Sequence, residues 1–203
     1  MTEGAQPARS QPFPQPDDVF QLRVSLMGIK PPIWRRVLVP QDVTLAQLHA
    51  ILQIVMGWTN SHLHQFKVGD VVFAEPHQEY EPGPIDHRRI TLNQIAPRRG
   101  STCVYEYDFG DSWRHDIVLE AIETGDLAYP RCTDGEGRCP PEDVGGISGY
   151  EHLKRVIADP GDAEHTAMLE WLGLESAREF DAAAFDLARA NAAMAGVPAA
   201  RIL

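Results

Sequence analysis

Two histidines spaced two residues apart are the first candidates for chemistry in this chain. His62 and His64 lie in SHLHQFKV (61–68), whose alternation predicts a β-strand. A strand places both imidazoles on one face, with Cα atoms about 6.6 Å apart. Imidazole nitrogens at that separation could bind one divalent metal ion. The alternative is that both side chains are hydrogen-bonded within a partly buried polar cluster.

A second segment, YEYDFGDSWRHD (105–116), could complete such a site. Aromatic and charged residues alternate there on both sides of a Gly-Asp-Ser turn, which predicts a β-hairpin. If this hairpin faces the strand at 61–68, its histidine and nearby carboxylates would supply further ligands. The predicted metal ligands are His62, His64 and His115, with Asp108, Asp111 or Asp143 as a further ligand or general base. A divalent metal is the one cofactor that the sequence suggests, and the sequence alone does not establish it.

The register of this hairpin is expected to follow from its turn. A three-residue loop, 110–112, would set Phe109 opposite Trp113 and Tyr107 opposite His115. The aromatic residues then share one face, whereas a two-residue loop would mix the two faces. We therefore expect the three-residue loop.

Carboxylates crowd the other face of the hairpin and the loop that follows it. The same register pairs Glu106 with Asp116, which is unfavourable unless solvent or a cation neutralises the pair. Residues 106–143 carry three Lys or Arg against eleven Asp or Glu, so −8 of the net charge of −11 lies there. This segment is either a solvated acidic surface or a cleft for a cation or basic partner. The candidate cleft comprises Glu106, Asp108, Asp111, Trp113, Asp116, Glu142 and Asp143.

The elements that must position these residues follow from periodicity and turn residues. The clearest is a helix over 44–56, because Thr44 and Gln47 fit a capping box and Gly57 suits the left-handed residue after a helix. In the strand at 33–39, Arg35 and Arg36 are expected at a solvated edge. Other strands are predicted at 19–26, 61–68, 71–74 and in the hairpin 102–123. Segment 125–150 is predicted to be a long loop, followed by helices near 150–159, 162–173 and 181–195.

These elements predict one α+β domain over residues 18–203, with antiparallel β-hairpins packed against one central helix and a C-terminal helical layer. Residues 1–17 are rich in Pro and Gln, which predicts a disordered tail. The tail lacks the basic start and apolar stretch of a signal peptide, and no apolar run reaches the roughly 18 residues of a membrane span. We therefore expect a cytoplasmic protein without a membrane partner.

Four segments carry a resemblance to a known family: KPPIWRRVLVP (30–40), TLAQLHAILQIVMGWTNSHLHQF (44–66), YEYDFGDSWRHDIVLE (105–120) and CTDGEGRCPPEDVGGISGY (132–150). Through them, residues 19–190 resemble the Ri-plasmid ORF-three-like family of bacterial and archaeal proteins. The resemblance implies an α+β fold and no established function. Some relatives carry labels such as resolvase or repressor, but a helix-turn-helix repressor needs a basic DNA-binding surface, which the net charge of −11 disfavours.

Three functions are compatible with the sequence. The preferred one is a non-catalytic binding or interaction module whose acidic and aromatic hairpin surface recognises a protein or small-molecule partner. The second is a metal-dependent hydrolase that uses the His and Asp cluster. The third is a DNA-associated protein of mobile elements, which ranks last because an acidic chain repels the phosphate backbone, so nucleic acid is not expected as a partner.

Overall fold

The computed structural model describes residues 18–76, 83–125, 127 and 130–195, so the predicted tail at 1–17 lies outside the described residues. Its strands are β1 (Asp18–Leu26), β2 (Trp34–Pro40), β3 (His64–Val68), β4 (Val71–Ala74), β5 (Ile85–Asp86), β6 (Thr102–Tyr107), β7 (Trp113–Thr124) and β8 (Arg131–Glu136). They form one eight-stranded sheet in the order β5-β4-β3-β6-β7-β1-β2-β8. Neighbouring strands are antiparallel except β4 and β5, which are parallel.

Five α-helices in the described residues accompany this sheet, so the fold is mixed α+β. They are α1 (Leu45–Met56), α2 (Leu92–Ile95), α3 (Gly146–Ala158), α4 (His165–Leu172) and α5 (Leu187–Met194), with 3₁₀ turns η1 (His87–Arg89) and η2 (Ala177–Glu179). The predicted hairpins thus belong to one continuous sheet. β8 lies inside the segment that the sequence predicted to be a loop, and it pairs with β2.

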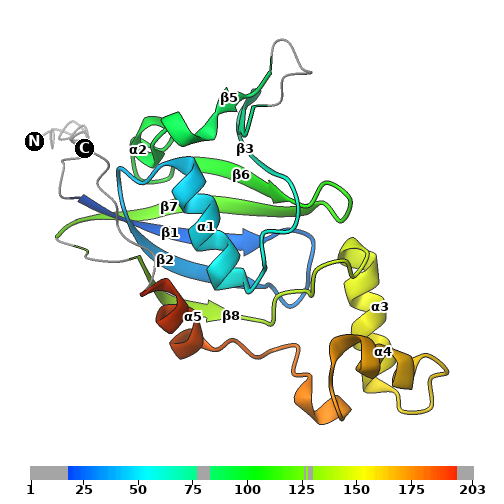
Figure 1. Ribbon diagram of the computed structural model, residues 1–203. Helices are drawn as coiled ribbons and strands as arrows, with labels where there is room; N and C mark the ends of the chain where they lie inside the picture. The colour runs from blue at the N-terminus through cyan, green and yellow to red at the C-terminus, as the bar shows by residue number, and fades with distance from the viewer. Residues whose placement is uncertain (1–17, 77–82, 126, 128–129, 196–203) are drawn as a thin grey trace, which may run out of the picture.

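Helix α1 lies across one face of the sheet (Figure 1). Its start is the predicted capping box: the Gln47 N–H donates to Thr44 Oγ1 at 3.2 Å, and the Thr44 N–H donates to Gln47 Oε1 at 2.8 Å. Gly57 ends it with a φ of 87°, as predicted. The apolar face expected from helical spacing is buried against the sheet, as Leu45, Leu48, Ile51, Leu52, Val55 and Met56 show.

A buried hydroxyl joins the middle of α1 to the sheet. Tyr105 on β6 is fully buried, and its Oη accepts a hydrogen bond from Gln53 Nε2 at 3.0 Å. His49 Nδ1 lies 2.7 Å from the same oxygen. A buried polar group is tolerated when it is hydrogen-bonded, so these contacts fix where α1 lies over β6.

Arg35 on β2 is buried rather than solvated, with 2% of its surface exposed. It donates to four backbone carbonyls at 2.8–2.9 Å, those of Trp34, Val55, Glu136 and Gly137. Its guanidinium also lies 3.8 Å from the ring centre of Phe185. The expectation of a solvated edge is wrong for Arg35 because adjacent strand residues point to opposite faces. Arg36 is on the outer face, where it pairs with Glu120 and Asp134, but β2 lies between β1 and β8 and is not an edge strand.

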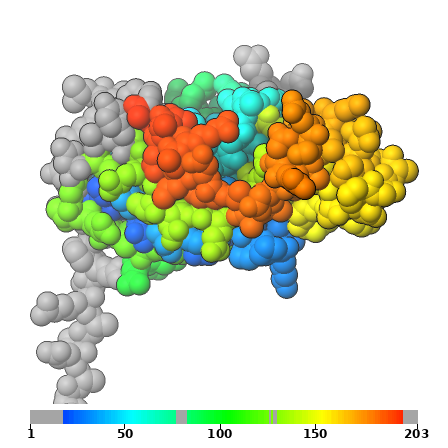
Figure 2. Space-filling view, turned by 90° about the horizontal axis from the view of Figure 1, so that it is seen from below, coloured from blue at the N-terminus to red at the C-terminus, as the bar shows by residue number. Residues whose placement is uncertain are grey.

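The C-terminal helices do not form one layer. α3 and α4 pack on each other and project from one side of the sheet, whereas α5 returns to lie against β8 and α1 (Figure 1). Figure 2 shows α5 and the segment before it along β8, with part of α1 visible between them. Asn191 of α5 accepts from the Cys132 N–H and donates to the Cys132 carbonyl, both at 2.9 Å. None of the helices in the described part of the chain is long and apolar enough to cross a bilayer.

Replacing Arg35 by Met should lower the free energy of unfolding by about 3 kcal/mol or more, because four carbonyls, three of them in buried hydrogen bonds, lose their donor. The neighbouring Arg36→Met is the matched control and should cost less than about 1 kcal/mol, since its ion pairs are partly exposed to solvent. Urea unfolding monitored by tryptophan fluorescence would measure both. Similar losses in the two variants would contradict the structural role of Arg35.

Candidate functional site

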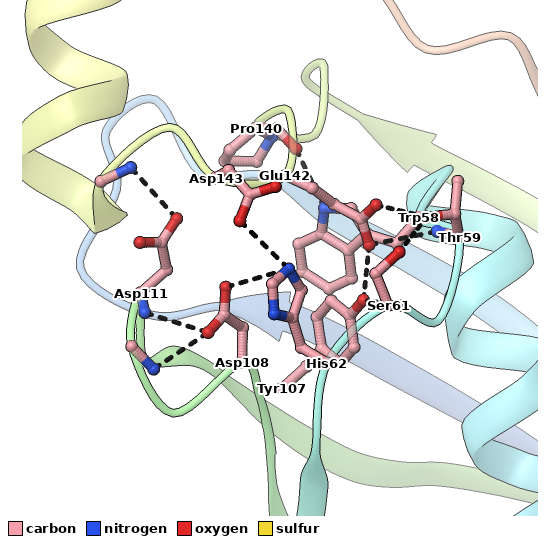
Figure 3. Close-up of polar contacts among 12 residues, drawn as sticks. Trp58, Thr59, Ser61, His62, Tyr107, Asp108, Asp111, Pro140, Glu142 and Asp143 are labelled. Carbon is pink, nitrogen blue, oxygen red and sulfur yellow. Dashed lines mark hydrogen bonds and ion pairs between the residues drawn. The ribbon is translucent and has the colours of Figure 1, made fainter.

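Three segments that are distant in the sequence meet at the tip of the β6–β7 hairpin (Figure 3). They are the α1–β3 connection at 58–63, the hairpin turn at 108–112 and the loop at 140–146 that leads into α3. We call the five ionisable side chains that these segments bring together the hairpin-tip site. It consists of His62, Asp108, Asp111, Glu142 and Asp143.

The hairpin turn is longer than the sequence suggested. β6 and β7 pair Tyr107 with Trp113 and Tyr105 with His115, so the turn spans 108–112 and the predicted three-residue register is wrong. The pairing is displaced by two residues, which preserves the alternation of faces. The predicted aromatic face therefore exists for Tyr105, Tyr107 and Trp113, although their cross-strand partners differ from the expected ones. Phe109, predicted on the same face, lies in the turn instead and is exposed.

Asp108 explains the longer turn. It adopts a left-handed φ of 57°, and its Oδ1 accepts hydrogen bonds from the N–H groups of Gly110 at 2.9 Å and Asp111 at 3.3 Å. Aspartate tolerates this backbone region because its side chain can bond the backbone two residues on. Its own N–H donates to the Leu63 carbonyl at 2.9 Å, which ties the α1–β3 connection to the turn. The second carboxylate oxygen is left facing His62 (Figure 3).

Glu142 anchors the third segment to the other two. It accepts hydrogen bonds from the Thr59 N–H at 3.2 Å, from the Thr59 hydroxyl and from the Tyr107 hydroxyl. Burial raises the pKa of Glu142, but the hydrogen bonds from Thr59 and Tyr107 outweigh it and hold the pKa below its ordinary value. Burial, together with the bond to Glu142, raises the pKa of Tyr107 above its ordinary value. Glu142 is thus an ionised structural acceptor.

Two further hydrogen bonds hold the loop at 140–146 in place. Trp58 Nε1 donates to the Pro140 carbonyl at 3.0 Å, and the Gly145 N–H donates to Asp111 Oδ2 at 3.1 Å. Between these anchors, Asp143 adopts a left-handed φ of 59°. Its carboxylate thereby faces the same nitrogen of His62 as that of Asp108 (Figure 3).

These two carboxylates converge on one nitrogen of the His62 imidazole. Its Nε2 is 3.3 Å from Asp143 Oδ1 and 3.6 Å from Asp108 Oδ2, and one ligand atom from each residue lies within 4.8 Å of the others. This nitrogen is shielded from solvent and forms no hydrogen bond with any described residue. Two atoms that each lie about 2.1 Å from a tetrahedral ion are about 3.4 Å apart. The two nitrogen–oxygen separations suit ligands of one shared cation.

The other residues of the predicted cleft lie elsewhere. Glu106 is on the outer face of the hairpin, opposite Arg114 rather than Asp116, so the predicted pairing of two carboxylates is wrong. It accepts a hydrogen bond from Gln65 Nε2 at 2.7 Å. Asp116 is exposed on the same outer face, and Trp113 is buried in the core. The structure therefore brings together Asp108, Asp111, Glu142 and Asp143 of the predicted set.

His64 lies in a separate group of imidazoles. Its ring stacks on that of His49, with centroids 3.4 Å apart and planes 3° apart, and lies 5.0 Å from that of His87. β3 begins only at His64, so His62 precedes the strand and the alternation that predicted a shared face does not extend to it. Burial lowers the pKa of His49 to about 4 and that of His64 to about 3, so both rings are neutral at pH 7.

His115 belongs to the core rather than to a metal site. It is fully buried, with its ring centroid 5.4 Å from that of Trp58 and 5.5 Å from that of Tyr105. His62, His64 and His115 are thus not brought together as one ligand set. Within the described residues, the one group of three or more potential metal ligands is His62 with Asp108 and Asp143.

Sequence reasoning overlooked Thr59 and His49. Thr59 supplies two of the hydrogen bonds to Glu142, and no pattern in the sequence indicates this long-range contact. His49 could have been found, because it lies four residues after Leu45 and therefore on the buried face of α1. Its ring bridges Tyr105 Oη and Asn60 Oδ1, each at 2.7 Å.

Comparison with known proteins identifies the family. The model of the plasmid pRiA4b ORF-3-like protein family matches residues 18–189. The chain belongs to this family. It is 40% identical over 178 residues to the uncharacterized protein y4hQ of Sinorhizobium fredii (strain NBRC 101917 / NGR234), covering 87% of this chain and 90% of that protein. The crystal structure of MM3350, a protein of unknown function from Methanosarcina mazei Go1, is 32% identical with a TM-score of 0.74, covering 84% of this chain and 96% of that one.

Neutral buried imidazoles should make this family member sensitive to acid. Burial lowers the pKa of His115 to about 4 from 6.5, so between these values the unfolded chain binds a proton that the folded chain does not. Proton uptake by His115 in the unfolded chain should alone lower the free energy of unfolding by about 3 kcal/mol as the pH falls from 6.5 towards 4.

The variant His115→Phe removes this proton-binding group and should flatten the dependence of the unfolding free energy on pH in that window. Urea unfolding at a series of pH values would measure the slope, which is independent of any packing cost that Phe brings at neutral pH. A variant that keeps the full slope of the natural protein would show that His115 is not a source of acid sensitivity.

Proposed function

We propose that the protein is a non-catalytic binding module whose hairpin-tip site holds a divalent cation through His62 Nε2, Asp108 Oδ2 and Asp143 Oδ1. The observation that carries this proposal is the convergence of three potential ligand atoms from three chain segments within 4.8 Å of one another. One imidazole and two carboxylates suit Zn²⁺ or Mn²⁺.

Preorganisation of the ligands supports the proposal. The Oδ1 atom of Asp108 is held by two backbone N–H groups, which fixes the direction of Oδ2 towards His62. Hydrogen bonds that orient a ligand in this way are typical of metal sites. The loop that carries Asp143 is also held in place, because Asp111 accepts a hydrogen bond from its Gly145 N–H and its Glu142 accepts one from the Thr59 N–H.

Electrostatics supports a cation as well. The carboxylates of Asp108 and Asp143 face one imidazole, and the surrounding segment 106–143 carries a net charge of −8 from three basic and eleven acidic residues. Such a field raises the local concentration of cations. Three protein ligands leave coordination positions that a carboxylate of a binding partner could complete.

A metal-dependent hydrolase is the second candidate, because three protein ligands with open positions are also typical of catalytic zinc sites. The non-catalytic reading is preferred because the neighbouring carboxylates are engaged. Glu142 accepts three hydrogen bonds, and Asp111 Oδ2 accepts one from the Gly145 N–H. A general base needs a free acceptor within reach of a substrate or water.

Isothermal titration of untagged, EDTA-treated protein with Zn²⁺ or Mn²⁺ should give one equivalent of bound metal. Asp143→Asn is the cleanest variant because this side chain is exposed and its loss should not disturb folding. It should weaken metal binding at least about tenfold, since perturbing a metal site usually costs 10–100-fold in affinity. Asp116→Asn, on the outer face of the same hairpin, is the matched control and should bind metal like the natural protein.

No binding of either metal, or an equal loss in Asp116→Asn, would refute the proposed cation site. The catalytic alternative is tested separately with the metal-loaded protein and an activated phosphate or carboxylate ester. Hydrolysis that exceeds the rate of free metal and disappears in Asp143→Asn would favour the hydrolase over the binding module.

A further inference from the structure

A hollow of about 1100 Å³ lies beside the hairpin-tip site. It opens between the first turns of α1, strands β3 and β4, and the segment at 83–88. Its volume slightly exceeds the roughly 300–1,000 Å³ of typical small-molecule pockets. We call it the imidazole pocket, because His49, His62, His64 and His87 all line it.

The rim of the imidazole pocket is unusually apolar. Seven large apolar side chains of the described chain are exposed, and four of them line this one hollow: Leu63, Val71, Ile85 and Phe109. Leu63 is 54% exposed and Phe109 is 48% exposed. Apolar side chains gathered around a concave surface indicate a ligand-binding or interaction site, whereas isolated ones need no explanation.

Polar atoms without a partner line the same hollow. His64 Nε2 and His87 Nδ1 are shielded from solvent and form no hydrogen bond with any residue in the described part of the chain. His87 is 5% exposed, so this nitrogen is deeply placed. A buried polar atom without a partner is costly, and native proteins usually supply one. A hydrogen-bonding group on a ligand would satisfy it.

Charge in the pocket disfavours an anionic ligand. Arg88 is engaged by Asp86 at 2.9 Å and by Glu75 at 3.3 Å. Burial lowers the pKa of His64 to about 3 and lowers that of His87, so these rings carry no charge at pH 7. Asp70 at the rim adds one negative charge, which repels anions.

Flat surfaces favour an aromatic ligand. Phe109 presents an exposed ring at the rim, whereas the rings of His49 and His64 stack on each other, parallel to within 3°. Planar rings stack on such surfaces with a gain beyond simple area burial. We infer that the imidazole pocket binds a neutral aromatic molecule that carries at least one hydrogen-bonding group, as phenols and indoles do. This site does not depend on the proposed cation, although His62 borders both.

Titration with naphthol tests this inference, because naphthol is flat, neutral at pH 7 and fluorescent. In the presence of EDTA, the full chain should bind one equivalent with a dissociation constant below the millimolar range. Phe109→Ala and Val71→Asp, two changes at exposed positions, should each weaken binding at least about fivefold through lost apolar contact. Naphthoate, the anionic analogue, should bind more weakly than naphthol.

Trp171→Ala is the matched control, since Trp171 is 49% exposed but does not line this pocket, and it should leave binding unchanged. Circular dichroism and urea midpoints would establish that each variant is folded. If Phe109→Ala does not fold, Val71→Asp still tests the inference. No saturable binding of naphthol, an equal loss in Trp171→Ala or tighter binding of naphthoate would overturn the inference. Asp143→Asn should keep naphthol binding even if it loses metal, and a loss of naphthol binding in this variant would place the ligand at the hairpin tip instead.

Discussion

A guanidinium inside a protein must find hydrogen-bond acceptors for its N–H groups, and Arg35 finds them in backbone carbonyls from three parts of the fold. One is the carbonyl of Val55 in the last turn of α1, where unpaired carbonyls and the helix dipole favour a cation. α1 has no basic residue of its own in that turn. Arg35 thus supplies from the sheet the positive charge that the helix end lacks, and it fixes where the chain leaves α1.

That exit point determines the position of both sites. The segment after α1 carries Thr59 and His62, and it is held by Glu142 on one side and by the Asp108 N–H on the other. The proposed cation ligands therefore lie on short connections, while helix and strands supply the rigid frame beneath them. Such a division between rigid frame and functional connection is common in proteins.

Local patterns in the sequence predicted those features that depend on local chemistry. The helix at 44–56 has the expected capping box and terminal glycine, because both depend on residues within four positions of each other. The aromatic face of the two hairpin strands was also predicted, since a displacement of two residues leaves each paired strand residue on its original face. The cross-strand pairing of β6 with β7 was not predicted correctly, because the Asp108 side chain stabilises a longer turn than the loop residues alone suggest.

Long-range contacts were not predictable in the same way. Arg35 and Arg36 are identical in type and adjacent, yet one is buried and the other is paired on the outer face, and only the packing of α1 and Phe185 over Arg35 distinguishes them. Of the predicted metal ligands, His62 joins two carboxylates only because the loop at 140–146 docks on the hairpin tip. The sequence predicted His64 and His115 as ligands on the same grounds, but His64 stacks on His49 and His115 is buried in the core.

The contact between Asn191 and Cys132 affects how this sheet meets other chains. The side-chain amide of Asn191 accepts and donates the two hydrogen bonds that a neighbouring strand would exchange with Cys132. β8 is the last strand of the sheet on this side, and an open edge of this kind is a template for aggregation or for recognition of extended peptides by strand addition. One amide on α5 therefore closes the edge at its buried cysteine, and partners that bind by adding a strand are excluded there.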